Sequence, residues 1–106
     1  MRLLLGVVAL SLVVGGQVYA GQKLGEAQGE RAPEVTYAKT CGYCHGRNVG
    51  PVIRGRNLPA EAIVRQVRHG QNGMPAFRPT EITNAELDAL AKWISASKAD
   101  PKEKGQ

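Results

Sequence analysis

The stretch Cys41-Gly42-Tyr43-Cys44-His45 decides how the rest of the sequence is interpreted. Two thiols at this spacing on one helical turn can add to the two vinyl groups of a haem. The histidine that follows then lies below the iron and can donate a ring nitrogen. The motif therefore predicts one covalently bound haem c, attached through Cys41 and Cys44 and ligated by His45.

Two other uses of the cysteines have weaker support. A thiol-redox pair of the thioredoxin type requires a βαβ context, and no segment of this sequence has a clear strand pattern. A zinc site requires two further ligands, and His69 is the only other histidine. The haem interpretation is therefore preferred.

A six-coordinate haem iron needs a second axial ligand. Once an N-terminal signal is removed, the chain has one methionine, Met74, in a loop rich in Gly and Pro. A methionine can also be an ordinary apolar residue, but a loop of this kind is a poor place for a core residue. We therefore expect Met74 to bind the iron, which would raise the reduction potential. His69, at the end of a predicted helix, is expected at the surface or as a cap.

Two further residues are predicted to support the haem. A ligating histidine usually donates its second ring N–H to an acceptor. The Pro51 carbonyl is at a suitable distance along the chain to accept it, although Gly50-Pro51 could also be a plain turn.

Between residues 47 and 78 there are six arginines and one acid, which makes this segment the most basic part of a chain of formal charge +5. Arg56 is expected to neutralise a haem propionate, and the other arginines to form either a basic rim that steers an acidic partner or a solvated surface.

The ends of the 106-residue chain suggest export and one small domain. A charged start, an apolar run over residues 3–14 and small residues before position 21 predict a cleaved signal peptide over residues 1–20. The run is too short for a bilayer-spanning anchor. We expect a flexible leader over 21–33, the domain over 34–98 and a charged, frayed tail over 99–106. The chain is thus placed in the periplasm, with no stable membrane insertion after cleavage and no nucleic-acid partner.

Three helices are expected within the domain. The first starts near Pro33 and runs into the Cys41–His45 motif, and the second spans Pro59–His69 with Gly70 as its C-terminal cap. The third begins with the capping-box pattern of residues 83–86 and ends near Lys98. Its apolar residues recur with helical spacing at positions 87, 90, 91 and 94. The sequence therefore predicts an all-α fold.

Together these pieces resemble a class I cytochrome c. The matching features are Tyr37-x3-Cys41, the Cys41–His45 motif, Gly50-Pro51, Met74-Pro75 and the C-terminal helix with Ala91-Lys92-Trp93-Ile94. The resemblance implies about three main helices wrapped around one covalent haem, with the first and last helices crossing and the haem edge exposed.

Residues 49–77 bear a narrower resemblance to the cytochrome subunits of p-cresol methylhydroxylase-type flavocytochromes, which are periplasmic oxidants of 4-alkylphenols. The shared features are Gly50-Pro51-Val52, Gly55-Arg56, Leu58-Pro59, Val67-Arg68 and Met74-Pro75-Ala76-Phe77. The resemblance implies a non-catalytic subunit that takes single electrons from a flavoprotein dehydrogenase and passes them to a downstream carrier. The alternative is a free-standing carrier between respiratory complexes, or between a quinoprotein dehydrogenase and a terminal oxidase. An enzyme or sensor with an open iron site is disfavoured, because no acid/base pair lies near Met74 in the sequence.

Overall fold

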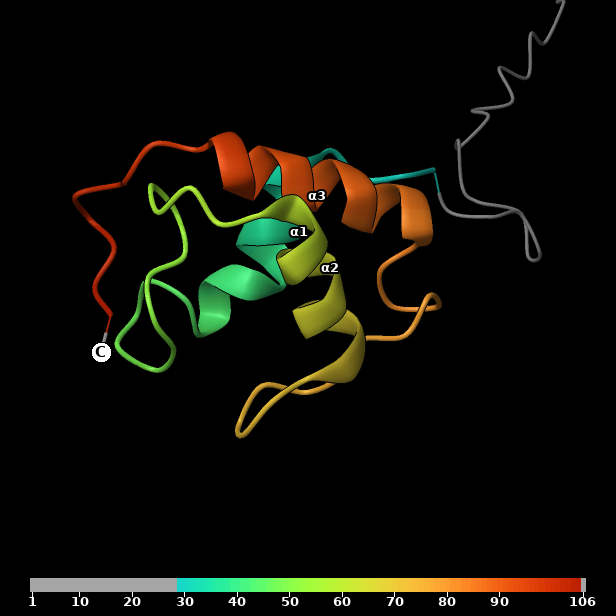
Figure 1. Ribbon diagram of the computed structural model, residues 1–106, viewed down its shortest axis with the longest axis horizontal. Helices are drawn as coiled ribbons and strands as arrows, with labels where there is room; N and C mark the ends of the chain where they lie inside the picture. The colour runs from blue at the N-terminus through green and yellow to red at the C-terminus, as the bar shows by residue number, and fades with distance from the viewer. Residues whose placement is uncertain (1–28, 106) are drawn as a thin grey trace, which may run out of the picture.

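The computed structural model describes residues 29–105, which form helices and irregular segments (Figure 1). This part of the chain contains isolated backbone bridges but no strand. The all-α prediction is therefore confirmed. The predicted signal peptide and most of the leader lie outside the described residues. The elements are α1 (Pro33–Lys39), the 3₁₀ turn η1 (Cys41–Tyr43), α2 (Ala60–His69) and α3 (Asn84–Ala96).

Helix α1 is shorter than predicted. Pro33 occupies its first turn and Glu34 lies at its positive end, as expected from the preferences of helix N-termini. The helix stops at Lys39 because Thr40, with φ −127° and ψ −64°, leaves the α-helical region. The backbone then tightens into η1, so the prediction that the helix runs into the Cys41–His45 motif is wrong, because α1 ends two residues before Cys41.

Helices α2 and α3 are close to their predicted bounds. Pro59 and Gly70 flank α2, and Gly70 has φ +68°, a conformation that favours glycine. At the start of α3, Thr83 and Glu86 form the complete capping box. Helix α3 ends at Ala96, two residues before the predicted Lys98.

Helix α3 is the centre of the hydrophobic core, and it packs against both α1 and α2 (Figure 1). The predicted stripe is confirmed, since the side chains of Leu87, Leu90, Ala91 and Ile94 are all buried. Tyr37 from α1 meets Trp93 with ring centroids 5.2 Å apart. The packing of α1 and α2 on one helix places the segments that follow them side by side, where the site is built.

The C-terminal residues are charged, as expected, but the prediction that they fray is wrong. The Lys104 N–H donates to the Gly46 carbonyl at 2.8 Å, and the Lys104 carbonyl accepts from the Asn48 N–H at 3.0 Å. The Tyr37 hydroxyl lies 2.6 Å from a carboxyl oxygen of Glu103. Residues 99–105 therefore form a strap along the loop that follows the cysteine motif. We call this segment the C-terminal strap.

An ion pair between a half-exposed arginine and a buried carboxylate joins the residues before α1 to the start of α3. The Arg31 Nε atom lies 2.7 Å from Glu86 Oε2, and the Arg31 backbone N–H donates to the same oxygen at 3.0 Å. Glu86 is 5 % exposed. The hydrogen bond from Arg31 lowers the pKa of Glu86 to about 2, against the opposing effect of burial.

Glu86→Gln should lower the free energy of unfolding by about 1–3 kcal/mol at pH 7, because it removes the charge of a buried partner while Gln still completes the capping box. The folded-state pKa of Glu86 is below its usual 4.5. The charged form therefore stabilises the fold above that value, and this stability is lost as the pH falls toward 2. Denaturant unfolding of the holoprotein at pH 7 and pH 2.5 measures both effects. The control is Asp88→Asn, because the Asp88–Lys92 pair is exposed and should contribute under about 0.5 kcal/mol. If Glu86→Gln lowered the free energy of unfolding by the same amount at both pH values, the ion-pair explanation would be contradicted.

Candidate haem site

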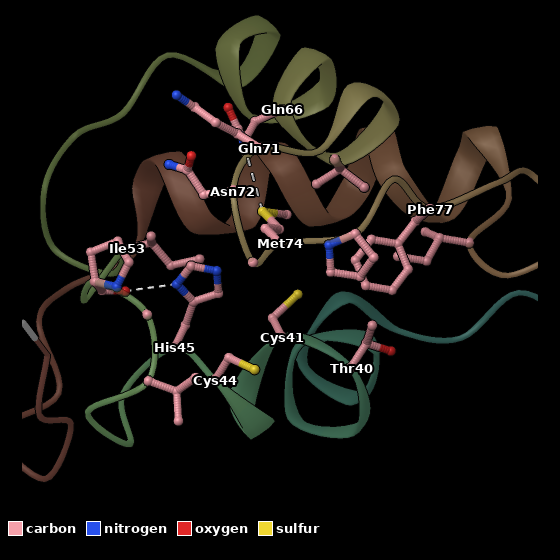
Figure 2. A pocket seen from close by; sticks show the side chains of 17 residues that line it. Thr40, Cys41, Cys44, His45, Ile53, Gln66, Gln71, Asn72, Met74 and Phe77 are labelled. Carbon is pink, nitrogen blue, oxygen red and sulfur yellow. Dashed lines mark hydrogen bonds between the residues drawn. The ribbon is translucent and has the colours of Figure 1, made fainter.

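A cavity of about 510 Å³ lies between the segment that follows α1 and the loop that follows α2 (Figure 2). Its size is within the range of sites for small organic ligands. The described wall carries no Asp, Glu, Lys or Arg, so it suits a large apolar group. It is lined by Thr40, Cys41, Cys44, His45, Val49, Gly50, Pro51, Ile53, Gln66, Val67, Gln71, Asn72, Gly73, Met74, Pro75, Phe77 and Ile82.

The Cys-x-x-Cys-His residues reach this cavity from η1 and the two residues after it. The Cys44 and His45 N–H groups both donate to the Cys41 carbonyl, at 3.1 and 2.9 Å. This tight turn brings both thiols and the imidazole to one cavity, as the motif predicted. Cys41 is half-buried and Cys44 is exposed.

The His45 ring is oriented by the next loop. Its Nδ1 atom lies 2.7 Å from the Pro51 carbonyl oxygen, so the expected acceptor is in place. Because a carbonyl only accepts, Nδ1 carries the proton and Nε2 keeps its lone pair. A side chain at Gly50 would place its Cβ 3.2 Å from the ring, so glycine leaves room for this orientation.

Met74 reaches the same cavity from the loop after α2. Reciprocal backbone hydrogen bonds between Gln71 and Met74, at 3.0 and 2.9 Å, close a tight turn. Gly70 allows this turn to approach α2, since a Cβ at Gly70 would lie 2.7 Å from the Met74 carbonyl oxygen. The Met74 Sδ atom lies 3.9 Å from Gln66 Nε2 (Figure 2).

Arg68 anchors this loop, a role that the sequence did not indicate. Its guanidinium donates to the Phe77 carbonyl at 3.1 Å and to Asn84 Oδ1 at 2.7 Å. The Phe77 N–H also donates to the Val67 carbonyl at 2.8 Å. These contacts tie the loop that carries Met74 to α2 and α3.

Arg56 is not on the described wall of the cavity. Its side chain is exposed, and the guanidinium lies 3.4 Å from the Val52 carbonyl, between two cavity-lining residues, Pro51 and Ile53. This contact places Arg56 near the rim. Its predicted contact with a propionate stays a prediction. His69 is exposed at the end of α2, as expected, and does not line the cavity.

The two rival interpretations of the cysteines fit poorly. The described residues supply no strand for a thioredoxin-type context. Burial raises the pKa of the Cys41 thiol to about 11, whereas reactive thiols require a lowered pKa. Within residues 29–105, no three His, Cys, Asp or Glu side chains gather to hold a metal ion, which leaves zinc without a ligand set.

The donors at this cavity suit a haem. Two thiols can form thioethers with its vinyl groups, an imidazole has a free Nε2, a thioether sulfur lies in the same cavity, and the wall is apolar. The fold and the site together define the class of this protein: a c-type cytochrome, which binds haem c covalently and transfers electrons.

Comparisons with known proteins specify the family. A family described as cytochrome c oxidase, cbb3-type, subunit III matches residues 28–94, and the chain belongs to this family of cytochrome c domains. The cytochrome c subunit of the hydroxylating 4-cresol dehydrogenase of Pseudomonas putida is 37 % identical over 92 residues, which cover 85 % of this chain and 80 % of the relative.

Two crystal structures of p-cresol methylhydroxylase contain a chain similar to this one. The substrate-bound structure matches with a TM-score of 0.60 and 37 % identity, covering 64 % of this chain and 95 % of the other. A second structure, at 2.5 Å resolution, matches with a TM-score of 0.58 and the same identity, covering 62 % and 93 %. The small cytochrome c fold and the resemblance noted in the sequence are both confirmed.

Proposed function

We propose that His45 Nε2 and Met74 Sδ are the two axial ligands of the haem iron and that Cys41 and Cys44 form its thioether bonds. The supporting observation is that one apolar cavity collects all four side chains from two separate segments. A haem bound here supplies an iron that alternates between the ferric and ferrous states.

The protein residues set the conditions for this exchange. The hydrogen bond from Nδ1 to Pro51 fixes the His45 ring and strengthens Nε2 as a donor. The thioether of Met74 favours the ferrous state and thus a higher potential. The apolar wall excludes water, and Arg56, near the rim, is the candidate counter-charge for a propionate.

We further propose that the chain is the electron-accepting cytochrome of a periplasmic flavoprotein dehydrogenase that oxidises 4-alkylphenols. The 37 % identical relative is the cytochrome c subunit of a hydroxylating 4-cresol dehydrogenase and aligns over most of both chains. Four of the six central arginines are exposed and can attract an acidic partner, either the dehydrogenase or a downstream carrier: Arg47, Arg56, Arg65 and Arg78.

The periplasmic location rests on the predicted signal peptide over residues 1–20. No helix within residues 29–105 is long and apolar enough to cross a bilayer.

Affinity purification of the tagged holoprotein from periplasmic extract of the native host tests this function. We expect a flavoprotein to co-purify at low salt, and addition of 4-cresol without oxygen should then give the absorption bands of ferrous haem. Because the arginine-dependent part of the attraction is screened by salt, the yield of complex should fall as the salt rises. The cytochrome alone with 4-cresol is the control. A monomer in every fraction, with no reduction by 4-cresol, would favour the free-standing carrier instead.

A further inference from the structure

The C-terminal strap lies directly against the loop that orients His45. In Figure 1 the last described residues run beside the loop that follows η1. The backbone contacts of Lys104 fall on Gly46 and Asn48, both within the turn that brings Gly50 back to His45. The outside of this turn contacts the strap, while its inside holds the His45 ring.

Glu103 is the side chain that attaches the strap to the domain. Its Oε1 atom accepts from the Tyr37 hydroxyl at 2.6 Å, a contact between residues 66 positions apart. Burial, followed by the hydrogen bond to Glu103, raises the pKa of Tyr37, so the phenol keeps its proton and donates it. Tyr37 is 6 % exposed and packs against Trp93, which makes it a rigid anchor.

The carbon atoms of Glu103 cover Gly46. A Cβ at Gly46 would lie 2.8 Å from Glu103 Cγ, and Gly46 has φ +93°, which favours glycine. A second contact holds the start of the strap, where Asp100 lies 3.6 Å from the Arg54 guanidinium. Glu103 is thus placed between a fixed point on α1 and the residue that follows His45.

We propose that Glu103 is a positioning residue for His45: by holding the strap on Tyr37, it clamps residues 45–51 and keeps the Pro51 carbonyl on His45 Nδ1. This inference rests on the proposed assignment of His45 as an iron ligand. A firm hydrogen bond at Nδ1 makes the imidazole a stronger donor and stabilises the ferric state. Release of the clamp therefore shifts the balance toward the ferrous state.

Glu103→Ala in the holoprotein should lower the ferric-to-ferrous ratio at a fixed ambient potential about threefold, which is an upward shift of about 30 mV. Exchange of the His45 Nδ1 proton with deuterium, followed by NMR in the ferrous state, should become about tenfold faster. The far-red charge-transfer band of ferric His/Met haem should stay, because Met74 is untouched.

Three further variants separate positioning from charge. Glu103→Gln removes the charge but keeps an acceptor for Tyr37, so it should behave like wild type. Tyr37→Phe removes the hydrogen bond without changing any charge, so it should behave like Glu103→Ala. The effects of Glu103→Ala and Tyr37→Phe should not add, because both break the same contact. Lys102→Ala, on an exposed residue of the same strap, is the control and should change neither the potential nor the exchange rate.

An unchanged potential or an unchanged Nδ1 exchange rate in Glu103→Ala would overturn the proposal. A Glu103→Gln shift as large as that of Glu103→Ala would also overturn it, because charge would then be the cause. If Glu103→Ala does not accumulate as holoprotein, Tyr37→Phe decides by the same two measurements. A wild-type protein without the far-red band would instead show that the assignment of Met74 fails, which is separate from the proposal for Glu103.

Discussion

Met74→Ala should lower the reduction potential of the holoprotein by about 0.1–0.3 V, within the range of about 0.8 V that axial ligands span. The thioether favours ferrous iron, and alanine leaves no donor at the turn closed by Gln71 and Met74. The backbone hydrogen bonds of this turn do not involve the Met74 side chain, so the loop should survive the change. Potentiometric titration gives the shift, and the far-red band of the ferric form should disappear. Carbon monoxide should bind rapidly to the ferrous variant and slowly to wild type.

Gln71→Ala is the matched control for Met74→Ala. It also removes a side chain that lines the cavity from the same turn, but this side chain is not a candidate ligand. We expect Gln71→Ala to keep the far-red band and the slow carbon monoxide binding. If the band and the slow carbon monoxide binding both persisted in Met74→Ala, the assignment of Met74 as the second ligand would be wrong.

The features that the sequence predicted correctly are local in the chain. Pro59 and Gly70 bound α2, and the capping box starts α3, because helix ends are determined by residues within one turn of each other. The distance between His45 and Pro51 is likewise set by a short loop. Met74 was selected by elimination, since the sequence after the predicted signal peptide offers few other donors, and the structure places it on the wall of the cavity that His45 also lines.

Contacts between residues far apart in sequence were missed. Glu103 meets Tyr37 across 66 positions, and Arg31 meets Glu86 across 55. No periodicity or capping rule indicates such pairs, and a charged C-terminal segment ordinarily suggests a frayed end. The strap is ordered because it forms hydrogen bonds with the loop after His45 and with Tyr37. Only folding brings these partners close to the C-terminal residues.

For the arginines of residues 47–78, composition predicts the charge of the segment but not which side chains are exposed. Its charge was evident from the sequence, but the directions of the side chains were not. Arg54 lies 4.9 Å from the centroid of Trp93, and Arg68 anchors the loop that carries Met74. The other four arginines are exposed. The basic surface is therefore smaller than the sequence suggested, and two of its expected members stabilise the fold.

Replacing both Cys41 and Cys44 by Ala should make the stability of the protein depend on haem concentration. With thioether bonds the haem is part of the chain, so added haem leaves Tm unchanged. Without them the haem is an ordinary ligand of the cavity, and it stabilises the fold by about 2.7 kcal/mol at 100 times its Kd and by little below the Kd. The expected result is a double variant whose Tm rises steadily with added haem. Denaturing gel electrophoresis with haem staining should show bound haem in wild type alone.

Cys44→Ala separates the loss of the tether from the loss of packing. Cys44 is exposed, so its own contacts contribute little, whereas Cys41 is half-buried and contacts the core. With Cys41 intact, one thioether remains, so the Tm of Cys44→Ala should be independent of added haem. Only the double variant should then respond to haem, since it alone binds the cofactor reversibly. A concentration-independent Tm in the double variant would mean that the cavity does not bind haem once the thioether bonds are lost.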